Sequence, residues 1–295
     1  MTVAITGAGG FIGRHLTEHL RSIGVSVREV NPRRDGWEAS LIGTDVLVHL
    51  AGSAHSSLQF HTGFDISTHE DVVLAKRLVL AAVTSGVQHI VHVSSVKAQG
   101  GWEISGESDI ETLPADNYGQ LKRAVEAAII RNASRSGLPV WITRLPLVYG
   151  PGVRANFLQL LKAVARGLPL PLGRATATRS YLGIRNLCSA LSCCIQQTPN
   201  GTATIYLADQ EPLSTRNLVQ MVSDLSHSKT ILLPLPRWMM RISLRMLGKG
   251  DVYSRLFEGF TIDSCSAREA LGWQPPFTTR EELQWTIQWY LDSRS

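Results

Sequence analysis

Two polar residues open a stretch with helical periodicity. Tyr118 and Lys122 lie four positions apart, so in a helix their side chains project from one face. A phenol has an ordinary pKa of about 10 and is a poor acid or base at neutral pH. Because a neighbouring ammonium favours the phenolate, we expect Lys122 to lower the pKa of Tyr118. The pair predicts a proton-transfer centre; the alternative is an exposed helix face without chemistry.

A pair of serines, Ser94 and Ser95, ends the apolar run that begins at Ile90. Ligands of open α/β sheets bind beyond the carboxyl ends of the strands. A hydroxyl at that place can hydrogen-bond an oxygen atom that is being oxidised or reduced. The alternative is a serine pair that caps the end of a strand.

Three glycines near the start supply a third element. Gly7, Gly10 and Gly13 follow the apolar run at 3–5 directly and precede a helical pattern. Gly7 allows a tight bend, Gly10 lets backbone N–H groups approach a pyrophosphate, and Gly13 lets the helix pack against the strand. Because strand, turn and helix come in the required order, the motif predicts a dinucleotide site.

The elements that must position these residues alternate along the first half of the chain. Helical patterns occur at 11–22, 67–85 and 117–136, between β-rich apolar runs at 3–6, 25–30, 46–50, 90–94 and 140–144. Continuous apolar runs are typical of strands that are covered on both faces. The alternation predicts an α/β fold with a Rossmann-type, doubly wound parallel sheet. The stretch 31–44 is too short for a strand and a crossover helix, so we expect one element to be trimmed there.

After Gly150-Pro151-Gly152 the rhythm changes. We expect a strand at 203–207 and helices near 156–166, 214–226, 236–247, 264–271 and 279–292. This predicts a dinucleotide-binding domain of residues 1–152, with returning strands from about 175–210, and a smaller mixed α/β substrate domain of residues 153–295. The stretch 237–247 is amphipathic and basic; we favour an apolar face packed inward over attachment to a membrane surface.

Composition narrows the class of protein. The chain has 295 residues, 44% of them apolar and 18% charged, which predicts a large core and no disorder. No apolar run is long enough for a membrane span, and the start lacks a leader pattern. The four cysteines and nine histidines show no metal-ligand spacing. We therefore expect no metal, free thiols and a cytoplasmic location.

The net charge of +5 comes from the second half, since acidic and basic residues nearly balance over 1–150. No dense basic stripe with interleaved aromatic residues occurs, so nucleic acid is not an expected partner. An anionic small-molecule substrate explains the surplus, and so does chance.

Several motifs give the chain a family resemblance. TGAGGFIG, HLAG, VHVSS, YGQLK and RLPLVYGPG resemble the extended short-chain dehydrogenase/reductases (SDR), the nucleotide-sugar epimerase/dehydratase family. The downstream stretches GPGVRANFLQLLKAVARGLPLPLG, RSYLGIRNL and REALGWQP are similar to the branch that acts on UDP-sugars at C4 in bacterial polysaccharide synthesis. The resemblance covers nearly the whole chain.

The resemblance implies roles for individual residues. Tyr118 would be the general acid and base, Lys122 would bind the nicotinamide ribose, and Ser95 would hold the C4 oxygen. The implied cofactor contacts, besides Tyr118 and Lys122, are Gly7, Gly10, Phe11, Ile12, Gly13, Asn31, Arg33, Arg34, Leu50, Ala51 and Pro146. The implied substrate contacts are Ser95, Lys97, Asn156 and Arg179, with Lys249 and Arg255 as weaker candidates. Asn156 and Arg179 would hold the pyrophosphate, and a guanidinium suits phosphate geometry.

The chain departs from the family pattern in its cofactor site. Asn31 stands where an acidic residue would grip the adenosine 2′-hydroxyl, and Arg33 and Arg34 follow. The loss of a carboxylate removes repulsion of a 2′-phosphate, so the pattern favours NADP over NAD. The alternative is a polar loop with two solvated arginines and relaxed specificity.

Two further departures concern the reaction. Lys97 stands where dehydratases of the family have an acidic residue, which disfavours dehydration. Lys97 would contact the substrate or face solvent. Asp71 stands where the family often has Asn on the helix below the cofactor. An ionised carboxylate accepts hydrogen bonds but donates none, so we expect that helix to be bonded differently.

The interpretation that we favour from the sequence is a UDP-4-keto-6-deoxy-HexNAc 4-reductase for surface polysaccharide synthesis. The first alternative is a UDP-sugar 4-epimerase, of the UDP-glucose or UDP-GlcNAc type, that retains NAD. An alternative of another class is a non-catalytic NADP-binding sensor protein. The resemblance also implies a homodimer formed through two helices, one of which carries Tyr118.

Overall fold

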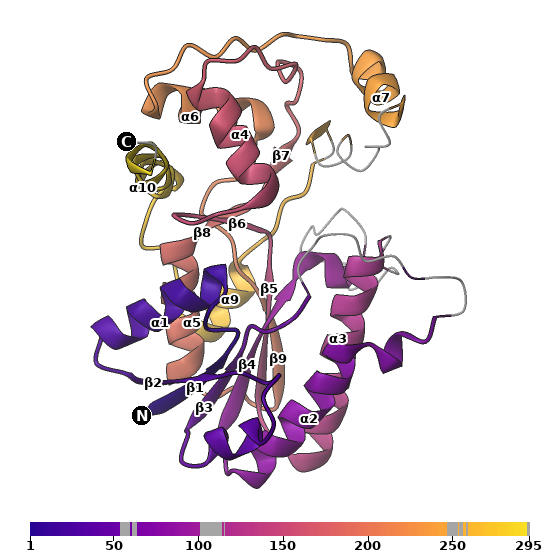
Figure 1. The fold of residues 1–295 in the computed structure, drawn as a ribbon, viewed down its shortest axis with the longest axis vertical. Helices are drawn as coiled ribbons and strands as arrows, with labels where there is room; N and C mark the ends of the chain where they lie inside the picture. The colour runs from indigo at the N-terminus through magenta and orange to yellow at the C-terminus, as the bar shows by residue number, and fades with distance from the viewer. Residues whose placement is uncertain are drawn as a thin grey trace.

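The structure is a computed structural model. It describes residues 1–53, 60, 64–100, 114, 116–246, 253, 256–257 and 259–293. Two lobes are visible in Figure 1, one built on a twisted sheet and an upper one built mainly of helices.

Six parallel strands form the sheet of the lower lobe in the order β2-β1-β3-β4-β5-β9. They are β1 (Thr2–Thr6), β2 (Ser26–Val30), β3 (Val46–His49), β4 (His89–Ser95), β5 (Val140–Leu145) and β9 (Thr202–Tyr206). The Rossmann-type α/β fold expected from the sequence is confirmed. Between β2 and β3 the chain forms the short 3-10 helix η1 (Trp37–Leu41) in place of a strand and crossover helix, as the length of that stretch predicted.

Helices cover both faces of the sheet (Figure 1). On one face lie α1 (Phe11–Ser22) and α5 (Ile184–Gln196), and on the other lie α2 (Glu70–Thr84) and α3 (Asn117–Ser136). The alternation of side chains along a strand divides the core accordingly. In β1, Val3 and Ile5 belong to the core under α1 and α5, whereas Ala4 belongs to the core under α2 and α3.

The sequence analysis missed helix α5. Its buried residues include Ile184, Leu187, Cys188, Leu191 and Cys194, which have helical spacing. Free cysteine behaves as a small apolar residue when buried.

The second half of the chain returns to the sheet. Strand β9 pairs with β5 in parallel, and α9 (Cys265–Leu271) adds Ala267 and Leu271 to the core under α1. The other short strands of the region join two-stranded sheets of their own. Strand β6 (Leu147–Tyr149) pairs with β8 (Tyr181–Gly183), and β7 (Thr178–Arg179) pairs with β10 (Leu213–Ser214).

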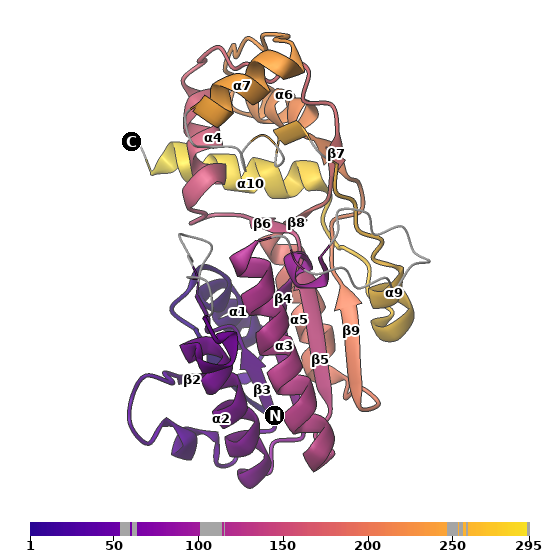
Figure 2. The same ribbon diagram turned by 90° about the vertical axis from the view of Figure 1, so that its right-hand side faces the viewer.

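The upper lobe has a separate apolar core, to which Phe157, Leu161, Leu218, Val222 and Leu283 contribute. Its helices are α4 (Ala155–Ala165), α6 (Thr215–Leu225), α7 (Arg237–Met246) and α10 (Thr279–Asp292). Helix α7 lies at the edge of this lobe in Figure 1 and on the side that faces the viewer in Figure 2. None of the helices that the structure describes has the length and apolar character that a membrane crossing demands.

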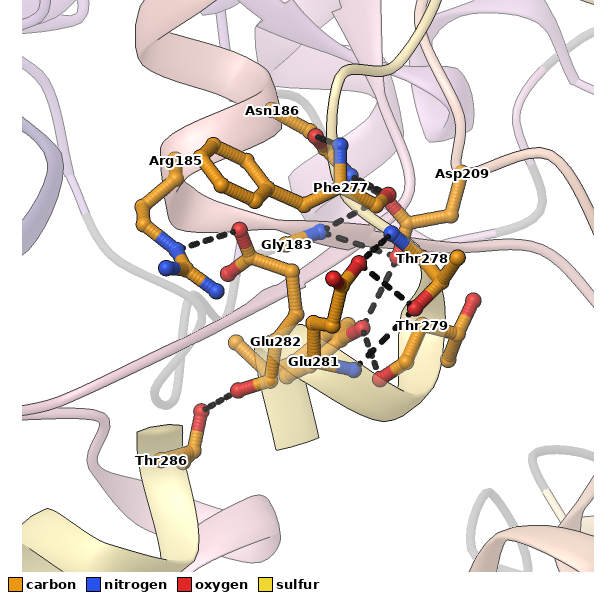
Figure 3. A network of polar contacts seen from close by, with 11 residues as sticks. Gly183, Arg185, Asn186, Asp209, Phe277, Thr278, Thr279, Glu281, Glu282 and Thr286 are labelled. Carbon is orange, nitrogen blue, oxygen red and sulfur yellow. Dashed lines mark hydrogen bonds and ion pairs between the residues drawn. The ribbon is translucent and has the colours of Figure 1, made fainter. Parts of the chain in front are cut away.

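A buried set of hydrogen bonds connects the lobes (Figure 3). The carboxylate of Asp209 accepts hydrogen bonds from the backbone N–H of Gly183 (3.0 Å), from Asn186 Nδ2 (2.8 Å) and from the Tyr149 hydroxyl (2.8 Å). Asn186 also donates to the Phe277 carbonyl oxygen and accepts from the Phe277 N–H, each at 2.9 Å. We call these five residues the inter-lobe network.

An ion pair lies beside this network. Arg185 Nε donates to Glu282 Oε1 at 2.9 Å, and the guanidinium stacks on Phe277 and Trp285 at 3.9 and 4.8 Å from the ring centres. Glu282 is fully buried, and its Oε2 atom has no hydrogen-bond partner among the described residues. Burial raises the pKa of Glu282 to about 7, although the charge of Arg185 opposes this.

Candidate active site

The glycine turn after β1 excludes side chains at two positions. A Cβ atom at Gly7, where φ is +75°, would lie 2.8 Å from the backbone nitrogen of Ala51, and one at Gly13 would lie 2.2 Å from the Gly7 carbonyl oxygen. Helix α1 then begins at Phe11 with no acidic residue in its first turn. The free backbone N–H groups and the positive end of the helix dipole can therefore receive a phosphate group.

Three of the predicted site residues come together at the carboxyl edge of the sheet. Ser95 is the last residue of β4, and its hydroxyl lies close enough to Tyr118, in the first turn of α3, to lower the pKa of the phenol against the effect of burial. One helical turn further, Lys122 Nζ lies 5.5 Å from the centre of the Tyr118 ring. This edge adjoins the glycine turn, because β3 alone separates β4 from β1.

A close approach of two backbones makes this contact possible. A Cβ atom at Gly119 would lie only 2.5 Å from the carbonyl oxygen of Lys97. Lys97 belongs to the 3-10 helix η3 (Val96–Gln99), which follows Ser95 directly. Glycine at 119 therefore allows the start of α3 to pack against the end of β4, which brings Tyr118 to Ser95.

The electrostatics of Tyr118 differ from the sequence expectation. Burial, and to a smaller extent the carboxylates of Asp116 and Asp71, raise the pKa of Tyr118 to about 12, and the Ser95 hydroxyl opposes this shift. The expectation that Lys122 lowers this pKa below its ordinary value is wrong, because burial outweighs the opposing contributions. Burial also lowers the pKa of Lys122 itself, against the charges of Asp71 and Glu126. Both groups therefore lie in surroundings that favour their neutral forms.

Asp71 takes part in this cluster from helix α2. Its Oδ2 atom accepts a hydrogen bond from the Ser53 backbone N–H at 2.7 Å. A Cβ atom at Gly52 would lie 3.1 Å from Lys122 Nζ and 3.6 Å from Asp71 Oδ2, so both groups converge on Gly52. The aspartate thus accepts a backbone hydrogen bond and supplies a negative charge close to Lys122. Ser95, Tyr118, Lys122 and Asp71 are hereafter called the sheet-edge cluster.

Lys97 has a partner that the sequence analysis did not consider. Its ammonium group forms an ion pair with Asp116, and it lies 5.8 Å from the centre of the Tyr118 ring. Asp116 also caps α3, because its side chain accepts a hydrogen bond from the Gly119 N–H at 2.7 Å. Lys97 therefore fastens η3 to the start of α3.

A buried ion pair between β5 and α3 lies close to the cluster, and it was not predicted from the sequence. Arg144 in β5 pairs with Glu126 of α3 at 2.7 Å and donates to the Tyr206 hydroxyl at 2.7 Å. Tyr206 in turn donates to Gln99 of η3. An arginine inside an otherwise apolar strand was the available signal, because a buried charge requires a partner.

Two stacked histidines lie beneath the cluster. The rings of His49 and His92 are 5.0 Å apart, and His49 Nδ1 is hydrogen-bonded to Thr6 Oγ1 at 2.8 Å. Burial lowers the pKa of His49 to about 3 and that of His92 well below its ordinary value, so both rings are neutral. Over the part of the chain that the structure describes, no group of histidine, cysteine, aspartate and glutamate side chains could hold a metal ion.

The residues expected to select the cofactor lie beyond β2. Asn31, Arg33 and Arg34 are exposed, and Asn31 Oδ1 accepts a hydrogen bond from the Arg33 N–H at 3.1 Å. Leu50 and Ala51 follow β3 and donate backbone hydrogen bonds to Thr6, at 3.1 and 3.4 Å.

Three other predicted cofactor residues lie in α1 and directly after β5. Ile12 is half-buried in α1, and Pro146 is half-buried between β5 and β6. The Phe11 ring packs against the cores of both lobes and meets His15 edge-on at 5.5 Å.

The predicted pyrophosphate residues belong to the upper lobe. Asn156 is exposed in the first turn of α4, and Arg179 is half-buried on β7. The charge of Arg179 opposes the effect of burial, which raises the pKa of Tyr181. Lys249 and Arg255 lie outside the described residues.

Comparison with known proteins identifies the class. Residues 3–207 match the model of the NAD dependent epimerase/dehydratase family, so the chain belongs to this family of NAD-dependent enzymes. It is 30% identical to a UDP-glucose 4-epimerase of Vibrio cholerae, over 100% of this chain and 97% of the relative.

Two further similarities extend over the whole chain. The chain is 23% identical to the N-acetyl-alpha-D-glucosaminyl-diphospho-ditrans,octacis-undecaprenol 4-epimerase of Escherichia coli O157:H7, over 97% of this chain and 94% of the relative. The crystal structure of a UDP-glucuronic acid 4-epimerase from Bacillus cereus in complex with NAD covers 100% of both chains, with a TM-score of 0.81 and 18% identity.

Proposed function

We propose that this protein is a UDP-sugar 4-epimerase, which inverts C4 of a UDP-linked hexose. The observation that carries the proposal is the grouping of Ser95, Tyr118 and Lys122 at one edge of the sheet, next to the glycine turn. The three similar proteins described above are all named as 4-epimerases. The site supplies what such a reaction requires of the protein, a proton donor and acceptor at the edge of a dinucleotide-binding sheet.

The residues present fit a nicotinamide dinucleotide. The turn at Gly7 and Gly13 and the first N–H groups of α1 would hold its pyrophosphate, and Lys122 would bind its ribose. When bound, the nicotinamide supplies or accepts a hydride and, when oxidised, adds a positive charge that favours the Tyr118 phenolate. Tyr118 accepts the proton of the C4 hydroxyl and later returns it, and Ser95 orients the C4 oxygen. Since the Tyr118 pKa is about 12, proton removal requires that added charge, whereas proton donation does not.

We propose that the upper lobe binds the UDP-sugar, with Asn156 and Arg179 on the pyrophosphate. Arg179 lies on β7, which the chain at Phe260 joins by backbone hydrogen bonds. The exchange Arg179→Gln should raise KM for a UDP-sugar about tenfold or more and change kcat little, because a charged hydrogen bond to phosphate is lost. An unchanged KM would place the pyrophosphate elsewhere.

We propose that the cofactor is NADP in preference to NAD. The exposed guanidinium groups of Arg33 and Arg34 and the absence of a carboxylate at Asn31 support this preference. The double variant Arg33→Glu/Arg34→Glu should weaken NADP binding by at least about tenfold and leave NAD binding within about twofold. Equal affinities of the unmodified protein for the two dinucleotides would contradict the proposal.

The second candidate is reduction of a UDP-4-keto-6-deoxy-HexNAc for surface polysaccharide synthesis, which the NADP-type loop favours because reductases consume their cofactor. A panel of UDP-sugars followed by NMR and by absorbance of the reduced cofactor separates the two functions. Interconversion of C4 epimers without net cofactor change is the result expected of the epimerase. Stoichiometric loss of NADPH with a 4-keto sugar would support the reductase instead, and neither reaction would overturn both.

We also propose a homodimer formed through α2 and α3. Helix α2 exposes Val73, Leu80 and Val83, and the side chain of Leu80 is 66% exposed. Apolar residues gathered on one helix are typical of contact surfaces. Light scattering should give the mass of two chains for the unmodified protein and of one chain for Leu80→Glu.

A further inference from the structure

Helix α7 presents apolar side chains to solvent. Trp238, Met239, Ile242 and Met246 are 65%, 39%, 53% and 84% exposed, whereas Met240 is buried at 8%. Ile231, in the segment that leads to α7, is another large apolar residue that is 62% exposed. The expectation that the apolar face of this stretch packs inward is therefore wrong for most of its large residues.

The exposed residues of α7 form parallel stripes. Trp238, Ile242 and Met246 recur every fourth residue and lie on one outward face. Arg237, Arg241 and Arg245 recur with the same spacing on the adjoining face, and α7 contains no acidic residue. An apolar stripe flanked by arginines is the arrangement found on helices that lie in the surface of an anionic bilayer.

A second copy of this chain suits the same surface poorly. A helix of ten residues is only about 15 Å long. One face of such a helix is too small to supply the roughly 800 Å² that each partner buries in a stable interface. Two copies related by a twofold axis would also bring their arginine stripes close together. A bilayer, in contrast, accepts a short apolar stripe and supplies negative charge for the arginines.

We propose that α7 is a membrane-surface helix that docks the upper lobe on an anionic lipid bilayer. Trp238, Ile242 and Met246 enter the boundary between head groups and acyl chains, and the arginines contact lipid phosphates. The exposed fractions of these three side chains show that the face is accessible in the structure, and α7 lies at the edge of the upper lobe in Figure 1. The proposal does not depend on which sugar the enzyme converts.

Vesicle flotation with the full chain tests the proposal. The protein should float with vesicles of phosphatidylcholine and phosphatidylglycerol, and added salt should weaken the binding, because surface charges are screened. Trp238→Ser/Ile242→Ser should lower the bound fraction about tenfold or more. Arg241→Gln/Arg245→Gln should weaken binding to the anionic vesicles several-fold.

A matched control makes the test specific. Ile23 and Ile42 are 49% and 66% exposed in the lower lobe, so Ile23→Ser/Ile42→Ser removes comparable apolar surface and should leave flotation unchanged. The proposal would be overturned if the protein did not float, or if it bound pure phosphatidylcholine vesicles equally well. It would also be overturned if Ile23→Ser/Ile42→Ser lowered the bound fraction as much as Trp238→Ser/Ile242→Ser does. A second copy of the chain would be the partner of α7 if the unmodified protein did not bind vesicles and Trp238→Ser/Ile242→Ser converted a dimer into a monomer in light scattering. That result would overturn the proposal.

Discussion

The sheet-edge cluster and the inter-lobe network are both built from polar groups with little access to solvent. Three donors from different elements converge on the Asp209 carboxylate and favour its charged form, although burial still raises its pKa. At Tyr118 the carboxylates of Asp71 and Asp116 add to the effect of burial and hold the phenol neutral, while the ammonium group of Lys122 lies 5.5 Å from the ring centre. The network therefore supplies its buried carboxylate with donors from the protein itself, whereas the cluster holds groups whose protonation a bound charge could shift. The difference separates a structural connection from a site suited to proton transfer.

The strongest test of this comparison removes the phenol. Tyr118→Phe should lower kcat about a thousandfold, because the proton donor and acceptor is lost, while the melting temperature stays nearly unchanged. Steady-state kinetics and thermal unfolding measure the two effects. Full retention of cellular function by this variant would favour the non-catalytic sensor.

The converse test removes the carboxylate of the network. Asp209→Ala leaves the buried partners Gly183, Asn186 and Tyr149 without their acceptor. The free energy of unfolding should fall by about 3 kcal/mol, as measured by denaturant titration, because buried donors lose their hydrogen bonds. The shape of the pH profile of kcat should remain that of the unmodified protein; a shifted profile would show that the two regions are not separate.

Two adjacent serines allow a comparison at the sheet edge itself. Ser95→Ala removes the hydroxyl that lies next to Tyr118 and should lower kcat about a hundredfold. The hydroxyl of Ser94 is buried and has no hydrogen-bond partner among the described residues, so Ser94→Ala should change kcat by no more than about threefold. Similar losses in both variants would remove the special role of Ser95.

The buried carboxyl of Glu282, beside the inter-lobe network, should make the free energy of unfolding depend on pH. Its pKa in the folded protein is about 7 against an ordinary 4.5, so its contribution to stability is complete below pH 4.5 and is lost as the pH rises through 7. Glu282→Gln should abolish this loss and raise the free energy of unfolding at pH 8 by up to about 3 kcal/mol. Glu281→Gln, on the exposed side of the same helix turn, is the control and should keep the pH dependence.

The smallest expected effect concerns Asp71. Its charge raises the pKa of Tyr118, so Asp71→Asn should move the midpoint of the pH dependence of kcat/KM to lower pH by about one unit. Glu70→Gln, an exposed neighbour on α2 with the same change of charge, should leave the midpoint in place. A midpoint that stays fixed in Asp71→Asn would show that Asp71 only binds Ser53.

Much of this architecture could be predicted from local patterns. The apolar runs marked the six strands of the sheet, and the order of glycine turn, serine pair and Tyr118 with Lys122 placed three site elements on one edge. Helix α5 was not predicted, although its buried residues have helical spacing. Two ion pairs were not predicted, Lys97 with Asp116 and Arg144 with Glu126. In each pair the two residues are far apart in the sequence, and no regular spacing relates them.

The sequence by itself determined the elements, their order and the residue types at their ends, because helix and strand periods are local properties. Only the tertiary structure decided that Tyr118 is held neutral, that Asp71 lies close to Lys122, and that the apolar stripe of α7 faces outward. Each of these depends on which atoms of distant segments surround a side chain and exclude water from it. Burial and the distances between charges are fixed by packing, and no local pattern encodes them.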